Sequence, residues 1–83
     1  MEKILAEVSV PAIGKSYDVF LPGSISIGQA VQMLNSVFAG LNEEYFRDSS
    51  QMVLCDKDNG VIYSPEDLVE ETRIMNGSRL LLI

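Results

Sequence analysis

The sequence is 83 residues long, the size of one small domain, and we expect a single domain over residues 1–83. Twelve Asp and Glu residues against six Lys and Arg residues give a formal net charge of −6, which disfavours binding to nucleic acid or to an anionic membrane surface. The absence of His and the single Cys argue against His-dependent triads, a disulfide framework and most metal sites. We therefore expect a protein that is not an enzyme and that uses no cofactor and no metal.

The hydrophobic segments are short. The longest apolar runs, such as Leu80–Ile83, have four residues, whereas a membrane-spanning helix needs about 20. No apolar stretch typical of a signal peptide follows Met1. We therefore expect a cytoplasmic protein without direct membrane insertion, in which Cys55 is a reduced, buried small side chain.

The first 22 residues predict a β-hairpin. From Lys3 to Val10 apolar and polar positions alternate, and the alternation resumes from Ser16 to Leu21. Between them, the segment 11–15 contains Pro and Gly and breaks the strand. We expect Ile4, Ala6, Val8 and Val10 to share one face of the first strand, and Tyr17, Val19 and Leu21 one face of the second.

A helix should follow, beginning at Ser26. Ser26 and Gln29 have the spacing of a capping box, and Gly40 is placed for a left-handed C-cap. The apolar residues then follow the 3.6-residue period of one buried face: Ile27, Ala30, Val31, Leu34, Val37, Phe38 and Leu41.

The second half of the chain predicts short strands separated by turns. The strands are expected at residues 51–55, 61–63 and 78–83, with a turn at residues 56–60. An irregular polar segment, residues 42–50, with a short helix around residues 43–46, should precede them. Ser64 and Pro65 have the N-cap and N1 spacing of a helical turn. The fold class is α+β, with a mixed sheet of about five strands packed on one main helix.

This order of elements resembles the ubiquitin-like (β-grasp) superfamily over essentially the whole chain. Within it, the sequence is similar to the small bacterial YukD/EsaB family, on the opening hairpin, on the capped helix and above all on the ending Ile74–Ile83, IMNGSRLLLI. The resemblance implies a cytoplasmic accessory or regulator of a type VII (ESX-like) secretion system. It also implies a protein partner, such as a membrane component of that system.

The sequence departs from ubiquitin and the sulfur carriers at its end. Those proteins present a flexible Gly-Gly tail to an activating enzyme, whereas here the residues Leu82 and Ile83 fall in the last predicted strand. We therefore disfavour a sulfur carrier or protein modifier and keep it as an alternative. A stand-alone homodimer is a second alternative.

Three other features suggest chemistry, and each has a simpler interpretation. Residues 56–60 resemble the start of a calcium loop, but Gly60 comes one position early and Asp67 stands where the loop needs Glu, which favours a solvated turn. Cys55 has no His to activate it, so a core thiol is favoured. Nine acidic residues lie between Glu43 and Glu71, and we interpret them as a solvated face, with docking of a basic partner as the alternative.

The strongest functional signal is hydrophobic. A sheet covered by a helix on one face only should alternate, yet Leu80–Ile83 and the segment 52–55 are apolar at every position. If Leu80 and Leu82 face the helix, Leu81 and Ile83 must lie on the open side of the sheet. The sequence therefore predicts a contiguous apolar, partner-binding surface there, formed by Leu5, Val53, Leu81 and Ile83.

Overall fold

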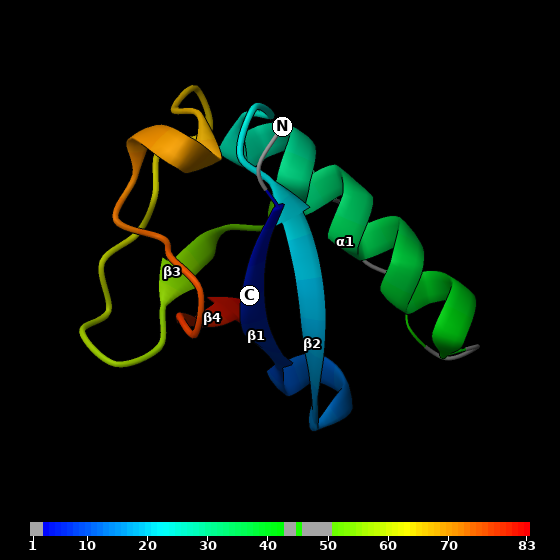
Figure 1. The fold of residues 1–83 in the computed structure, drawn as a ribbon. Helices are drawn as coiled ribbons and strands as arrows, with labels where there is room; N and C mark the ends of the chain where they lie inside the picture. The colour runs from blue at the N-terminus through cyan, green and yellow to red at the C-terminus, as the bar shows by residue number, and fades with distance from the viewer. Residues whose placement is uncertain (1–2, 43–44, 46–50) are drawn as a thin grey trace.

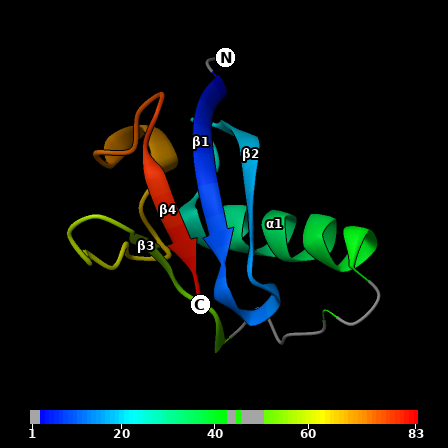
Figure 2. The ribbon, with the colours of Figure 1, turned by 90° about the horizontal axis from the view of Figure 1, so that it is seen from below.

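The computed structural model describes residues 3–42, 45 and 51–83. One mixed sheet has the strand order β2-β1-β4-β3, and the single α-helix packs across one of its faces (Figures 1 and 2). The strands and the helix have the following bounds: β1 Lys3–Val10, β2 Lys15–Pro22, α1 Ile27–Leu41, β3 Leu54–Asp56 and β4 Arg79–Leu82. This arrangement confirms the α+β prediction.

The predicted hairpin is confirmed. β1 and β2 pair antiparallel over their whole length, from Lys3 opposite Pro22 to Val10 opposite Lys15. A short 3-10 turn, Pro11–Ile13, joins them, and Gly14 adopts φ 62°, a left-handed conformation that favours glycine. The even-numbered residues of β1 and the odd-numbered residues of β2 face the helix, as the alternation predicts, and Ala6, Val8 and Leu21 are buried there.

The first and last strands lie side by side. β1 pairs parallel with β4, with Val8 opposite Leu80, and β4 pairs antiparallel with β3, with Leu82 opposite Leu54. Parallel neighbours need a crossover connection, and α1 forms part of it. The buried core lies between α1 and the sheet, and its largest fully buried side chains are Phe38, Leu21, Ile27, Leu34, Leu54, Leu80 and Leu82.

The start of α1 is as predicted and its end is not. The Ser26 hydroxyl accepts from the Gln29 N–H and the Gln29 side chain accepts from the Ser26 N–H, so the capping box is confirmed. The C-cap prediction for Gly40 is wrong, because Gly40 lies within the helix. Asn42 ends it instead: its N–H and its side-chain amide both donate to the Phe38 carbonyl, so no left-handed cap is needed.

Two residues assigned to the buried helix face are exposed. Val37 is 46% and Leu41 61% exposed, whereas the rest of that set is buried. The last turns of α1 extend past β2, which is the edge strand of the described sheet (Figure 2). A periodic pattern identifies a helix face but cannot tell where the sheet ends.

The second half contains less regular structure than predicted. Of residues 61–63 only Ile62 pairs, in a single bridge with Cys55, so this segment is not a full strand. Ser64–Asp67 forms a turn, and the 3-10 turn comes later, at Val69–Glu71. The carbonyls of Pro65 and Asp67 accept from the N–H groups of Gly28 and Ile27, so this segment is tied to the start of α1. The short helix predicted around residues 43–46 lies largely outside the described residues.

Candidate protein-interaction surface

The face of the sheet away from α1, called the open face from here on, carries all four predicted partner-binding residues. Leu5 on β1 is 40% exposed and Ile83, just after β4, is 42% exposed. Leu81 and Val53 are half-buried. Val53 exchanges two backbone hydrogen bonds with Ile83, of 2.7 and 3.0 Å, so these two side chains are neighbours on the open face. Their role in binding stays a prediction.

Two further apolar side chains on this face were not among the predicted residues. Phe20 lies directly opposite Leu5 and is 61% exposed. Its position on the solvent side of β2 was readable from the alternation, since an aromatic residue there has no core to fill. Ile62 lies opposite Cys55 and is 63% exposed. The signal that could have found Ile62 is the predicted turn at residues 56–60 between two predicted strands, because strands joined by a short turn pair antiparallel.

The strand register divides these side chains into two groups. One, the N-terminal pair, consists of Leu5 and Phe20; the other, the C-terminal patch, consists of Val53, Ile62, Leu81 and Ile83. Between them runs a charged row in which Glu7 lies opposite both Asp18 and Arg79. The apolar surface is therefore not contiguous across the sheet, which corrects that part of the prediction.

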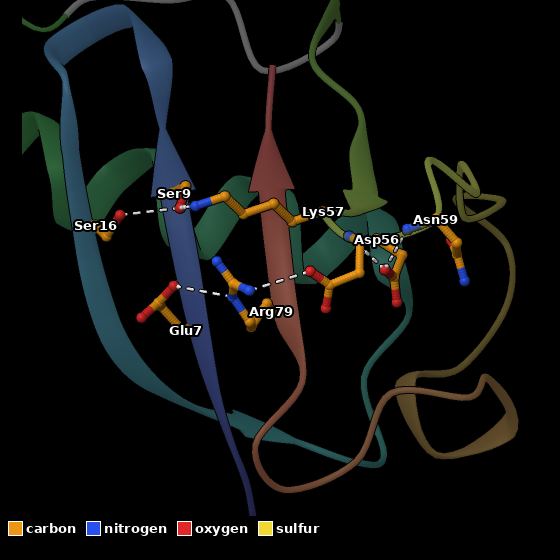
Figure 3. Close-up of polar contacts among 8 residues, drawn as sticks. Glu7, Ser9, Ser16, Asp56, Lys57, Asn59 and Arg79 are labelled. Carbon is orange, nitrogen blue, oxygen red and sulfur yellow. Dashed lines mark hydrogen bonds and ion pairs between the residues drawn. The ribbon is translucent and has the colours of Figure 1, made fainter.

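Polar contacts tie the charged row across the strands (Figure 3). The Arg79 guanidinium lies 3.8 Å from the Glu7 carboxylate and 3.2 Å from that of Asp58. Lys57 reaches across β4, and its ammonium donates to the Ser9 hydroxyl at 3.0 Å. Ser9 in turn lies 2.9 Å from the Ser16 hydroxyl. The ion pairs are exposed, so we expect them to orient side chains rather than to add more than about 1 kcal/mol each.

The turn at residues 56–60 has the geometry of a solvated turn. One oxygen of the Asp56 carboxylate accepts from the N–H groups of Asp58 and Asn59, at 2.8 and 3.1 Å, and Gly60 adopts φ 76°. In the part of the chain that the structure describes, no three His, Cys, Asp or Glu residues are grouped as metal ligands would be. The Asp56 carboxylate is instead used by the backbone of the turn.

Cys55 is a buried thiol, as predicted. It is 4% exposed, and its sulfur lies 3.6 Å from the carbonyl oxygen of Leu81. Burial and, to a lesser extent, the charge of Asp56 raise the pKa of the Cys55 thiol. A raised pKa disfavours the thiolate, which is the reactive form.

The acidic residues of the second half lie on the surface. Of the nine, Glu43, Glu44 and Asp48 lie outside the described residues; the other six are exposed or half-buried: Asp56, Asp58, Glu66, Asp67, Glu70 and Glu71. This placement agrees with a solvated face. No helix within the described ranges is long and apolar enough to cross a membrane.

Comparisons with solved structures show the fold. The N-terminal ubiquitin-like domain of the 4931431F19Rik protein superposes with a TM-score of 0.76 at 16% identity, over 98% of this chain and 73% of that one. The ubiquitin-like domain of the Mycobacterium tuberculosis type VII secretion system protein EccD1 gives 0.75 at 13% identity, over 100% and 99%. A chain from the structure of ATBAG1 in complex with HSP70 gives 0.71 at 15% identity, over 96% and 39%.

These likenesses define the class of the protein by its architecture. No protein-family model matches the sequence, and no curated protein matches it. At these identities a structural likeness shows the fold and not the activity. The chain therefore has the ubiquitin-like β-grasp fold, as the order of its elements predicted.

Proposed function

We propose that this chain is a non-catalytic protein-interaction module whose partner docks on the open face of the sheet. The observation that carries the proposal is the exposure of large apolar side chains there while the core on the other face is filled without them. Phe20 and Ile62 are each more than three-fifths exposed. Apolar groups gathered on one face of a small domain are typical of a surface that another protein covers.

The setting we propose is a type VII secretion system. The ending Ile74–Ile83 resembles the YukD/EsaB family, and the fold is similar to the ubiquitin-like domain of EccD1. The first likeness implies a cytoplasmic accessory or regulator, with a membrane component of the secretion machinery as its partner. The second is a likeness of fold to a domain of a type VII secretion system protein.

The absence of catalysis is part of the proposal and rests on the chemistry of the chain. The sequence has no His, and its one thiol is buried with a raised pKa. Within the described residues, the open-face carboxylates of Glu7 and Asp58 contact Arg79, and that of Asp18, opposite Glu7, is exposed. Asp56, at the end of β3, accepts from the turn. None of them is placed as an acid–base pair needs.

The test is affinity capture from the native host with three baits, followed by mass spectrometry. Ile83→Glu puts a charge into the C-terminal patch, and Val37→Glu is the matched control, because Val37 is similarly exposed but lies on α1. We expect secretion-system components to be captured by the wild type and by Val37→Glu and lost with Ile83→Glu. Circular dichroism should show all three baits folded.

Other outcomes would overturn the proposal. Equal capture of those components by all three baits would remove the patch as the docking site. Conjugates, or an intact mass showing sulfur in place of a carboxylate oxygen, would support the sulfur carrier or modifier instead. A dimer in light scattering that Ile83→Glu dissociates would identify the patch as a homodimer interface.

A further inference from the structure

The helix and the outer edge of the sheet form a surface without charge. Residues 19–42 include no Asp, Glu, Lys or Arg, whereas no other stretch of the chain without these residues is longer than seven. The run covers the second half of β2 and the whole of α1. A helix that packs on one side of a small domain usually carries charged side chains on its outer face. In a chain with a net charge of −6, the uncharged α1 is therefore an exception.

Three apolar side chains follow one side of α1 at the spacing of successive turns: Met33, Val37 and Leu41. Met33 packs in part against the core, whereas Val37 and Leu41 are exposed. The last turns of α1, which carry these two residues, extend past β2, the edge strand of the described sheet (Figure 2). A strand added at this edge would extend the sheet beneath Val37 and Leu41.

The backbone of β2 can accept such a strand. The Glu7 N–H donates to the Ser78 carbonyl, so the odd-numbered residues of β1 point their backbone groups toward β4 and the even-numbered residues toward β2. By the register of the hairpin, the odd-numbered residues of β2 point back toward β1. The N–H groups of Asp18 and Phe20 therefore point outward, and no described residue accepts from them. An eight-residue edge strand without a bulge is a template for pairing.

We propose that a second copy of this chain covers the surface, with the two β2 strands paired antiparallel across a two-fold axis. Charge selects this occupant, because two copies that each carry −6 repel one another, and residues 19–42 bring no carboxylate into the contact. The shape of the surface selects it as well. The two-fold axis places the last turns of each helix over the partner's β2, so Val37 and Leu41 are covered in both copies at once.

One register of the two β2 strands keeps like charges apart. With Val19 opposite the partner's Val19, each Asp18 lies opposite the partner's Phe20, and the two Asp18 carboxylates do not face each other. Asp18 and the partner's Phe20 then exchange the outward backbone hydrogen bonds that neither makes within its own chain. The two sheets become one continuous sheet with both α1 helices on the same face.

Sedimentation equilibrium of the 83-residue chain tests the proposal. We expect the mass to rise from 9.2 kDa toward twice that value as the protein concentration increases. Val37→Glu and Leu41→Glu each put a carboxylate into the contact, so both variants should stay at 9.2 kDa with an unchanged circular dichroism spectrum. Ile62→Glu is the matched control, because Ile62 is 63% exposed against 61% for Leu41 but lies on the open face. It should still form the dimer.

Amide hydrogen exchange locates the contact. In the dimer the N–H groups of Asp18 and Phe20 donate to the partner, so their exchange should be slow at high protein concentration and should become faster on dilution. In Val37→Glu, which we expect to be monomeric, both amides should exchange fast at every concentration. A dimer held only by contacts between helices would leave these two amides unprotected.

Several results would overturn the inference. They are a mass of 9.2 kDa for the wild type at every concentration, a dimer that survives both α1 variants, and fast exchange of Asp18 and Phe20 in the dimer. A dimer that only Ile62→Glu dissociates would move the contact to the C-terminal patch. A monomer that cosediments with phosphatidylcholine vesicles would assign the uncharged surface to lipid.

The dimer and the proposed function can fail separately. We expect Val37→Glu to lose the dimer while it still captures secretion-system components. We expect Ile83→Glu, on the other surface, to lose those components while it still forms the dimer.

Discussion

At the scale of single residues, two glycines with the same empty surroundings have opposite roles. Gly77 adopts φ 89° in the turn before β4, and its N–H donates to the Leu5 carbonyl; Gly40 lies in α1 with no positive φ. A Cβ at either position would meet nothing within 4 Å. We expect Gly77→Ala to lower the free energy of unfolding by about 1–2 kcal/mol, and Gly40→Ala to raise it by about 0.5–1 kcal/mol.

Chemical denaturation of the two variants measures both effects against the wild type. The substitution is the same in each case, so any general effect of adding a methyl group cancels and only the backbone conformation differs. If both variants are destabilised to the same extent, steric contact rather than φ decides the outcome.

At the scale of elements, the start of α1 is held from two directions. The N–H groups of Ser26 and Gln29 each donate to the other residue's side chain, while those of Ile27 and Gly28 donate to carbonyls in the segment 65–67. All four N–H groups that a helix leaves unpaired at its start therefore have acceptors. We expect Ser26→Ala to lower the free energy of unfolding by about 1 kcal/mol, because the Gln29 N–H loses its acceptor.

The control for this change is Ser24→Ala, two residues earlier at an exposed position whose side chain forms no hydrogen bond with the described residues. It should leave the unfolding midpoint in urea within error of the wild type, whereas Ser26→Ala should move it clearly lower. An unchanged midpoint for Ser26→Ala would mean that the anchors from Pro65 and Asp67 suffice to hold the first turn.

What the sequence could predict at this scale depends on how local the cause is. The capping box needs only residues 26 and 29, and the strand faces follow from alternation, so both could be predicted. The exposure of Val37 and Leu41 could not, because it depends on how far the sheet extends beneath the helix. The place of the segment after Ser64 could not be predicted either, because its carbonyls at Pro65 and Asp67 accept from α1, which is remote in sequence.

At the scale of the whole molecule, local and long-range causes again differ in what they predict. The apolar residues of the open face follow from local patterns, whereas the polar contacts between them follow from long-range pairing. The alternation of side chains along the first and last strands predicts that Leu5, Leu81 and Ile83 share one face. The pairing of Val53 with Ile83 places Val53 on the same face. The charged row between them follows from the pairing of Glu7 with Arg79, which joins the first strand to the last. The contact of Lys57 with Ser9 crosses β4 and joins residues 48 apart in sequence. A single sequence carries no signal for such a contact.

The pH dependence of stability is also a property of the whole chain. The sequence has no His, so no side chain with an ordinary pKa titrates between about pH 6 and pH 8, and we expect stability to be nearly constant there. At higher pH two groups matter. Burial and the charge of Asp56 raise the pKa of Cys55; burial, the charge of Asp56 and a hydrogen bond to it, and the charge of Cys55 raise the pKa of Tyr63.

A raised pKa means that the folded chain keeps a proton that the unfolded chain has already released. The stability it contributes is complete below the unfolded pKa, about 8.5 for Cys and about 10 for Tyr, and is lost as pH rises through the folded pKa. We therefore expect the free energy of unfolding to fall progressively above about pH 8.5. Urea unfolding at closely spaced pH values measures the profile. Cys55→Ala should shift the onset of this fall to higher pH, and Tyr63→Phe should reduce the loss near pH 10; a profile unchanged in both variants would assign the alkaline loss to other groups.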